Sequence, residues 1–129
     1  MAAYLLDADA VIDFINRHTP TVALVEQLIL NDERLCTCEV VLAEVYAGLT
    51  QRDEERASKF LQTLDFLPGT SESAERAGRW RYQFARRGRV LPTTDALIAA
   101  TAVEHNVTIV TGNVRDYLMP EVSLLPLPR

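Results

Sequence analysis

The sequence predicts an α/β domain in which a mostly parallel sheet of about five short strands is covered by helices on both faces. Short apolar runs rich in β-branched residues alternate with longer stretches whose apolar residues recur at helical spacing. This alternation is typical of parallel sheets, whose strands are buried between two layers of helices. The length of 129 residues, with 48% apolar and 24% charged residues, suits a single domain over residues 1–129.

Five short apolar runs are the predicted strands, and the clearest is 107–110, where every residue is β-branched. In chain order the predicted strands are 4–6, 35–37, 66–68, 107–110 and 122–125.

Helical segments are predicted between and after these strands from apolar spacing and capping signals. Thr19 or Thr21 can cap the second helix, and Ile29 belongs to its apolar face. Gly69 and Gly88 mark breaks before and after the fifth helix. In chain order the helices are an amphipathic stretch after Asp7, then about 20–31, 40–49, 53–64, 71–87, 93–104 and a short one near 114–118.

The charge distribution argues against nucleic-acid binding by bulk attraction but allows a local contact. With a formal net charge of -5, the chain is not expected to coat nucleic acid by bulk attraction. Six of its 13 basic residues are arginines between positions 76 and 89, and their planar donors suit phosphate. These arginines are interleaved with three aromatic residues, Trp80, Tyr82 and Phe84. We predict that Arg86, Arg87 and Arg89 contact nucleic acid; the alternative is a solvated helix face with the aromatic side chains in the core or in a dimer contact.

Two further features bear on the compartment. No segment approaches the ~18 uncharged apolar residues of a membrane span, and the first residues lack the basic region of a signal peptide. We therefore expect a cytoplasmic protein without membrane contacts. Cys36 and Cys38 have no histidine or further cysteine nearby at ligand spacing, so we expect buried thiols rather than a zinc site.

Acidic residues occur where a parallel sheet binds its ligands. Asp7 directly follows the first strand, Asp95 lies in the first turn of the sixth helix, and Asp116 follows the fourth strand. The carboxyl ends of parallel strands and the N-termini of the intervening helices meet at one edge of the sheet. We therefore expect these three side chains to lie at the same edge.

Glu44 lies in a helix that is apolar on nearly every side. Burying an unpaired carboxylate costs several kcal/mol, so Glu44 must be protonated, paired with a cation or bound to a metal. The alternative is a glutamate that reaches solvent or a single arginine. At ~1.5 Å per residue, Glu44 is roughly 8 Å along its helix and within reach of the same edge.

Carboxylates gathered at one edge raise one another's pKa unless a divalent cation neutralises them. Oxygen ligands without softer donors select Mg²⁺ or Mn²⁺, and such an ion suits phosphodiester hydrolysis. Whether one ion or two would act is left open. Taken singly, Asp95 could be an ordinary acid at a helix terminus, and Asp116 could be a turn residue. The proposed catalytic and metal-binding residues are Asp7, Glu44, Asp95 and Asp116.

Three neighbouring residues are candidates for supporting roles. Asp9 could cap the first helix or act as an outer metal ligand. The hydroxyl of Thr111 could hold a carboxylate or a water molecule, or Thr111 could simply end a strand. Asn113 follows in the same loop.

Four segments that carry these residues resemble, in order, the successive motifs of PIN-domain proteins. The segments are 5–13 (LLDADAVID), 43–48 (AEVYAG), 94–102 (TDALIAATA) and 109–117 (IVTGNVRDY). Each motif alone is weak, but four in the right order over nearly the whole chain are specific. The chain is most similar to VapC-type toxins of bacterial and archaeal toxin-antitoxin pairs.

The resemblance implies a three-layer α/β/α PIN-like domain that cleaves RNA, tRNA being one candidate, with Mg²⁺ or Mn²⁺. It also implies a homodimer and inhibition by a small VapB-type antitoxin. Asp7, Glu44 and Asp95 match the first three acids of the family. Family members differ in the position of the fourth acid, so Asp116 is taken as the fourth ligand, and Asn113 and Thr111 as supporting groups.

Two alternatives belong to other classes. The chain could be a non-catalytic binding module with a PIN fold, which intact acids argue against. The Asp7-Ala8-Asp9 sequence after a strand is also similar to the start of a haloacid-dehalogenase phosphatase, with Asp7 as nucleophile. That family needs a late lysine, whereas the only lysine here, Lys59, lies in the middle of the chain.

Overall fold

Five short parallel strands form the sheet of the computed structural model, which describes residues 2–128. The strands are, in chain order, β1 (Ala3–Leu6), β2 (Arg34–Cys38), β3 (Asp65–Leu67), β4 (Thr108–Thr111) and β5 (Leu124–Pro126). Their order across the sheet is β3-β2-β1-β4-β5, and every neighbouring pair is parallel. The predicted parallel sheet of about five strands is confirmed.

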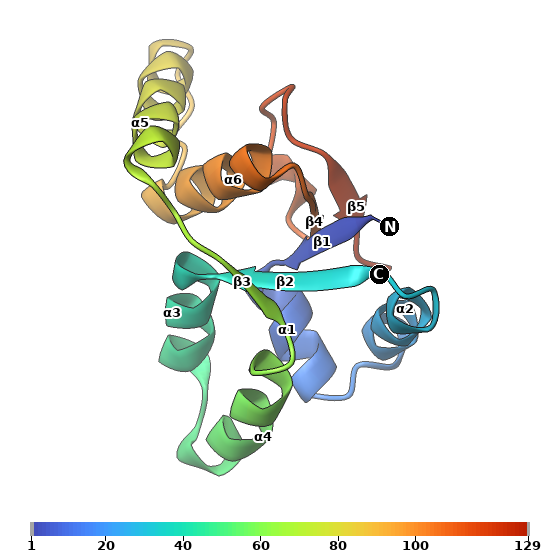
Figure 1. Ribbon diagram of the computed structural model, residues 1–129. Helices are drawn as coiled ribbons and strands as arrows, with labels where there is room; N and C mark the ends of the chain where they lie inside the picture. The colour runs from blue at the N-terminus through green and yellow to red at the C-terminus, as the bar shows by residue number, and fades with distance from the viewer. Residues whose placement is uncertain (1, 129) are drawn as a thin grey trace.

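Helices cover both faces of this sheet. They are, in chain order, α1 (Ala8–Ile15), α2 (Thr19–Leu30), α3 (Glu39–Gly48), α4 (Gln51–Leu61), α5 (Ser71–Arg86), α6 (Thr93–His105) and the short 3₁₀ helix η1 (Val114–Asp116). Helices α1 to α4 lie on one side of the sheet, and α5 and α6 lie on the other (Figure 1). Right-handed crossovers explain this division, because the chain runs outward from β1 to β3 and then returns past β1 to β4.

The two central strands provide the middle of the core. Leu5 and Leu6 of β1 pair in register with Ile109 and Val110 of β4, and all four side chains are fully buried. Successive side chains on a strand point to opposite faces, and here each face is covered by helices. This burial on both sides explains why the strands are continuous apolar runs in the sequence.

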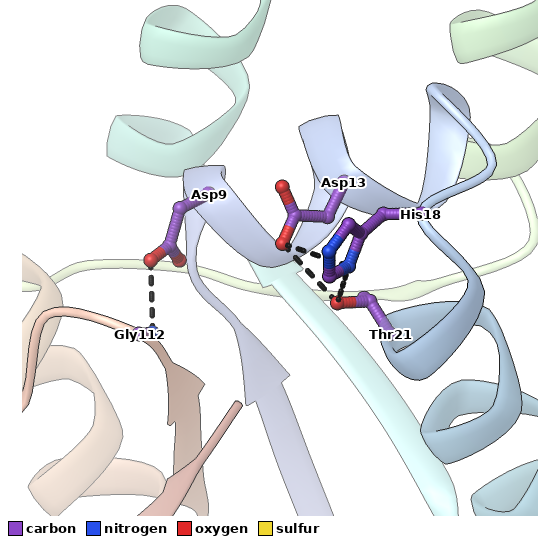
Figure 2. A network of polar contacts seen from close by, with 5 residues as sticks. All are labelled: Asp9, Asp13, His18, Thr21 and Gly112. Carbon is purple, nitrogen blue, oxygen red and sulfur yellow. Dashed lines mark hydrogen bonds and ion pairs between the residues drawn. The ribbon is translucent and has the colours of Figure 1, made fainter. Parts of the chain in front are cut away.

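The start of α2 differs from the prediction. Its N-cap is His18, not Thr19 or Thr21. Thr21 is buried one turn further on, where its hydroxyl donates to Asp13 of α1 (3.1 Å) and lies 3.3 Å from the His18 ring (Figure 2). The threonine thus joins two helices instead of capping one.

Two other local predictions are wrong. Ile29 is 53% exposed, because α2 turns Val25 and Leu28 inward instead. The last strand begins at Leu124, two residues later than predicted, and its Pro126 lies on an edge strand, where a missing N–H is tolerated.

Both cysteines are buried and free, as predicted. Within residues 2–128, no helix combines the length and the apolar character needed to cross a bilayer.

Candidate active site

Five acidic side chains lie at the carboxyl edge of the sheet, where the strand order reverses around β1. Asp7 follows β1 and caps α1, and Asp9 lies in the first turn of that helix. Asp95 lies in the first turn of α6, and Asp116 lies in η1, shortly after β4. Glu44 lies in the middle of α3, which follows β2. The parallel topology thus brings acids from both halves of the chain to the edge where open α/β sheets bind ligands.

Asp7 is the most rigidly held of these acids. Its side chain is only 5% exposed. The backbone N–H of Ala8 donates to Oδ1 (2.9 Å), while the hydroxyls of Thr111 and Tyr117 both donate to Oδ2 (2.8 Å each). Thr111 itself accepts a hydrogen bond from the backbone N–H of Asn113 (3.0 Å), which leaves its own proton for Asp7. These three donors stabilise a carboxylate in a buried position.

Asp9 connects α1 to the loop after β4. Its Oδ2 accepts a hydrogen bond from the backbone N–H of Gly112 (2.8 Å; Figure 2). The possibility that Asp9 caps the helix is excluded, because Asp7 occupies that position. Asp9 therefore helps to hold in place the loop that carries Asn113 and Asp116.

Mutual repulsion shows that the acids form one cluster. Burial and then the negative charges of Asp7 and Asp9 raise the pKa of Glu44. Burial and then the charges of Asp116, Asp7 and Glu44 raise the pKa of Asp95 from 3.8 to about 6. Each of these carboxylates thus senses several others.

Four acids of this cluster have no basic partner among the described residues. None of the ion pairs within residues 2–128 involves the acids at the sheet edge, namely Asp7, Glu44, Asp95 and Asp116. The same part of the chain contains no three His, Cys, Asp or Glu side chains close enough together to hold one metal ion as they stand. The acids are therefore neighbours that repel one another, and they do not form a preassembled cage.

Tyr117 is a residue of this site that the sequence interpretation missed. It is buried, and its hydroxyl donates to Asp7. Burial first, and then the charge of Asp7, raises the pKa of the phenol, so Tyr117 remains a protonated donor. The only sequence signal was an aromatic residue directly after Asp116, which is equally typical of a core position.

The predicted supporting residues lie beside Asp7, whereas the predicted RNA-binding arginines lie at and just after the end of α5. Asn113 is exposed and contributes its backbone N–H, through the bond to Thr111. Of the aromatic residues between the arginines, two are in the core, Trp80 and Phe84. Tyr82 is 64% exposed and packs under the guanidinium of Arg86, which also donates to its hydroxyl (3.0 Å). The burial of Trp80 and Phe84 agrees with the alternative of a helix with aromatic side chains in the core, while RNA binding by the arginines stays a prediction.

Arg87 and Arg89 follow at the end of α5. Both are exposed, and the guanidinium of Arg87 lies over the ring of Phe84 (5.4 Å). Arg89 lines a small cleft together with Asp116, which places it beside the acidic cluster.

The fold and the site together define a three-layer α/β/α protein with an acidic centre at the carboxyl edge of a parallel sheet. The family model of the PIN domain matches residues 4–120, and the chain belongs to this family.

Curated relatives align over most of their length. Ribonuclease VapC2 of Rickettsia felis is 26% identical over 119 residues, which cover 88% of this chain and 89% of the relative. The tRNA(fMet)-specific endonuclease VapC of Shigella flexneri is 28% identical over 122 residues, which cover 91% of each chain.

Solved structures show the same fold. In the complex of VapBC2 from Rickettsia felis with a DNA fragment from its promoter, the similar chain has a TM-score of 0.85 at 23% identity, covering 98% of this chain and 99% of that one. DNA-bound VapBC from Salmonella typhimurium contains a chain with a TM-score of 0.83 at 24% identity, covering 98% of both. The three-layer PIN fold is thereby confirmed.

Proposed function

We propose that this chain is a VapC-type endoribonuclease, the toxin of a toxin-antitoxin pair, which cleaves RNA with the help of Mg²⁺ or Mn²⁺. The observation that carries the proposal is the buried carboxylate of Asp7, which is held by three donors close to Glu44, Asp95 and Asp116; none of these four acids forms an ion pair within residues 2–128. The relatives named as a ribonuclease and as a tRNA-specific endonuclease support the same reaction and make tRNA a candidate substrate.

The donor set suits a hard divalent cation. Every candidate ligand is a carboxylate oxygen, and uncompensated negative charge favours Mg²⁺ or Mn²⁺ over softer metals. Bound there, the ion would activate a water molecule for attack on phosphorus and stabilise the departing oxygen. The residues that would hold it are Asp7, Glu44, Asp95 and Asp116.

The acids would contribute differently. Asp7 is fixed by its hydrogen bonds and would define the position of the site, with Thr111 and Tyr117 as positioning residues. Glu44 and Asp95 are partly exposed, and their carboxylates form no hydrogen bond within residues 2–128, so they can move toward a ligand. Burial and the neighbouring acids raise the pKa of both groups in the cation-free protein, and a bound divalent cation would relieve that repulsion.

An apolar groove offers a place for the antitoxin. It has a volume of about 420 Å³ between α1, α2 and α4, with Phe14, Val22 and Phe60 among its apolar side chains. Arg17, Glu26 and Arg56 lie at the same groove, so its charged lining carries both signs. The apolar lining suits the apolar face of an amphipathic segment, and the structural relatives are themselves toxin-antitoxin complexes. A homodimer and a cytoplasmic location belong to the same proposal.

Cleavage assays on chain purified free of antitoxin test this function. The parent should cut RNA when Mn²⁺ is added and stop when EDTA is added, while Asp7→Asn should be inactive. Glu54→Gln is a matched control, because it removes an exposed acid of α4 outside the cluster, and it should cut like the parent. RNA left intact by the parent, together with no binding of Mn²⁺ in calorimetry, would replace this proposal by the non-catalytic binding module.

The phosphatase alternative is not supported. Lys59 is exposed on α4 and pairs with Glu55 (3.6 Å), which leaves Asp7 without the lysine that such a phosphatase needs. Asp7 itself is buried and accepts three hydrogen bonds, an arrangement suited to a fixed ligand and not to a nucleophile.

A further inference from the structure

Two apolar side chains are exposed next to the acidic cluster on backbone that the fold holds in place. Val90, in the connection between α5 and α6, is 91% exposed, and Leu118, just after η1, is 48% exposed. The guanidinium of Arg81 donates to the carbonyl oxygen of Leu91 (2.9 Å), and the Leu91 side chain is buried. The backbone is thus anchored while Val90 points to solvent, as expected of an apolar contact surface.

Two arginines flank these side chains. Arg89 and Arg115 line one small cleft together with Val90 and Leu118. Neither guanidinium forms an ion pair or a hydrogen bond within residues 2–128. Four other arginines, all in α5, are each held by a neighbouring group: Arg76, Arg79, Arg81 and Arg86. Arg89 and Arg115 therefore remain available for a phosphate.

The cleft borders the acidic cluster. Asp116 lines it next to Arg115, and the charge of Asp116 acts on Asp95 across the site. The cleft has a volume of only about 20 Å³, which is too small for a nucleobase. A base can therefore lie over its apolar rim but cannot enter it.

We infer that Arg89, Val90, Arg115 and Leu118 form a subsite for one unpaired nucleotide of the RNA, adjacent to the phosphate at the acidic cluster. We call these four residues the Val90 subsite. The two guanidinium groups would pair with phosphates that the acids alone would repel, and the apolar side chains would cover a base. A base paired in a duplex does not expose its face to such a surface, so the subsite selects single-stranded RNA. This inference rests on the proposed ribonuclease function and specifies the form of its substrate.

Binding measured in EDTA tests the subsite without cleavage. The probes are fluorescein-labelled hexauridylate and hexaadenylate, with a short RNA duplex for comparison, titrated with the full chain and followed by fluorescence anisotropy. Val90→Ser is compared with Leu30→Ser, because Leu30 is also an exposed apolar residue but lies at the end of α2. Arg115→Gln is compared with Arg52→Gln, which changes an exposed arginine of α4.

The two subsite variants should weaken binding in different ways. Val90→Ser should weaken binding of the hexanucleotides about 5-fold through lost apolar contact, with an unchanged salt dependence. Arg115→Gln should weaken binding and reduce the slope of log affinity against log salt by about 0.7, the loss of one phosphate contact. Both control variants should bind like the parent, and Val90→Ser should not change binding of the duplex. The methyl NMR signals of Val90 and Leu118 should shift when a hexanucleotide is added.

Several outcomes would overturn the inference. If Val90→Ser bound the hexanucleotides with parental affinity, and the methyl signals of Val90 and Leu118 did not shift on their addition, RNA would not bind at this surface. If Val90→Ser turned a dimer into a monomer in light scattering without changing RNA affinity, the surface would be a contact between two copies of the chain.

The two proposals can fail separately. If the parent cuts no RNA but the subsite variants still lose hexanucleotide affinity, the ribonuclease proposal fails and the binding site stands. If the parent cuts RNA and Asp7→Asn does not, while Val90→Ser binds and cuts like the parent, the subsite alone fails.

Discussion

Replacing Asp95 by asparagine is expected to stabilise the cation-free protein above about pH 6 while abolishing RNA cleavage. The carboxylate of Asp95 lies among other negative charges, and asparagine keeps its shape without its charge. A variant that gains stability and loses activity cannot owe its inactivity to misfolding. The opposite signs of the two effects make this change informative.

The size of the effect follows from the pKa. Burial and neighbouring acids raise the pKa of Asp95 from 3.8 to about 6, which corresponds to an upper limit of about 3 kcal/mol. Because the side chain is partly exposed, solvent screening reduces this to about 1–2 kcal/mol. An acid with a raised pKa binds its proton more tightly in the folded state. The free energy of unfolding of the parent should therefore fall as the pH rises from about 4 to about 6 and stay low above it.

Urea unfolding in EDTA at a series of pH values measures this effect. The difference in unfolding free energy between Asp95→Asn and the parent should be near zero at pH 4 and reach its full value by pH 7. Glu26→Gln, a change at an exposed acid of α2, serves as the control and should show no such rise. Adding Mn²⁺ at pH 7 should stabilise the parent, by about 2.7 kcal/mol at 100 times the Kd, and should stabilise the variant less.

Parallel pH profiles for Asp95→Asn and the parent would refute the reasoning. Such profiles would mean that the other acids do not raise the pKa of Asp95. Repulsion between carboxylates would then give no reason to expect a cation at this site. Cleavage at the parental rate by this variant would independently remove Asp95 from the catalytic residues.

Three further changes test other parts of the site. Tyr117→Phe removes one hydrogen-bond donor from Asp7, so it should lower the free energy of unfolding by about 1.5–3 kcal/mol and weaken Mn²⁺ binding. An unchanged urea midpoint and an unchanged calorimetric Kd for Mn²⁺ would contradict this role. Glu44→Gln should raise the free energy of unfolding in EDTA at pH 8, because burial and nearby acids raise the pKa of Glu44, and this variant should also cleave less RNA. A loss of stability would show that the carboxylate is favourably paired. Replacing Arg86 and Arg87 together by alanine should weaken RNA binding and reduce its salt slope by up to about 1.4, and equal affinities across salt would assign both arginines to a solvated helix face.

The fold and the position of the site could largely be predicted from the sequence, because both depend on local patterns. Strand β4 consists of β-branched residues, and α5 ends near a glycine with positive φ, Gly88. Once a parallel sheet is inferred, chain direction alone places Asp7 and Asp95 at one edge.

Local errors arose where packing overrides helical spacing. Ile29 fits the apolar period of α2, yet the orientation of that helix leaves it exposed. Thr21 has the chemistry of a cap, but the approach of α1 gives its hydroxyl a better partner in Asp13. Intrinsic propensity gives the conformations and hydrogen bonds that a residue can adopt. Packing against neighbouring helices determines which of them occurs in the folded protein.

By itself, the sequence determined the order of elements, their class and the set of acids available at the sheet edge. Only the tertiary structure decided that Tyr117 holds Asp7, a hydrogen bond between residues 110 positions apart. It also decided that Arg89 and Arg115 lie beside Asp116 without an ion pair or side-chain hydrogen bond to any other residue between positions 2 and 128. Periodicity encodes which face of an element is buried. It does not encode which distant side chain comes within about 3 Å of another, because that depends on the orientation in which packed elements meet.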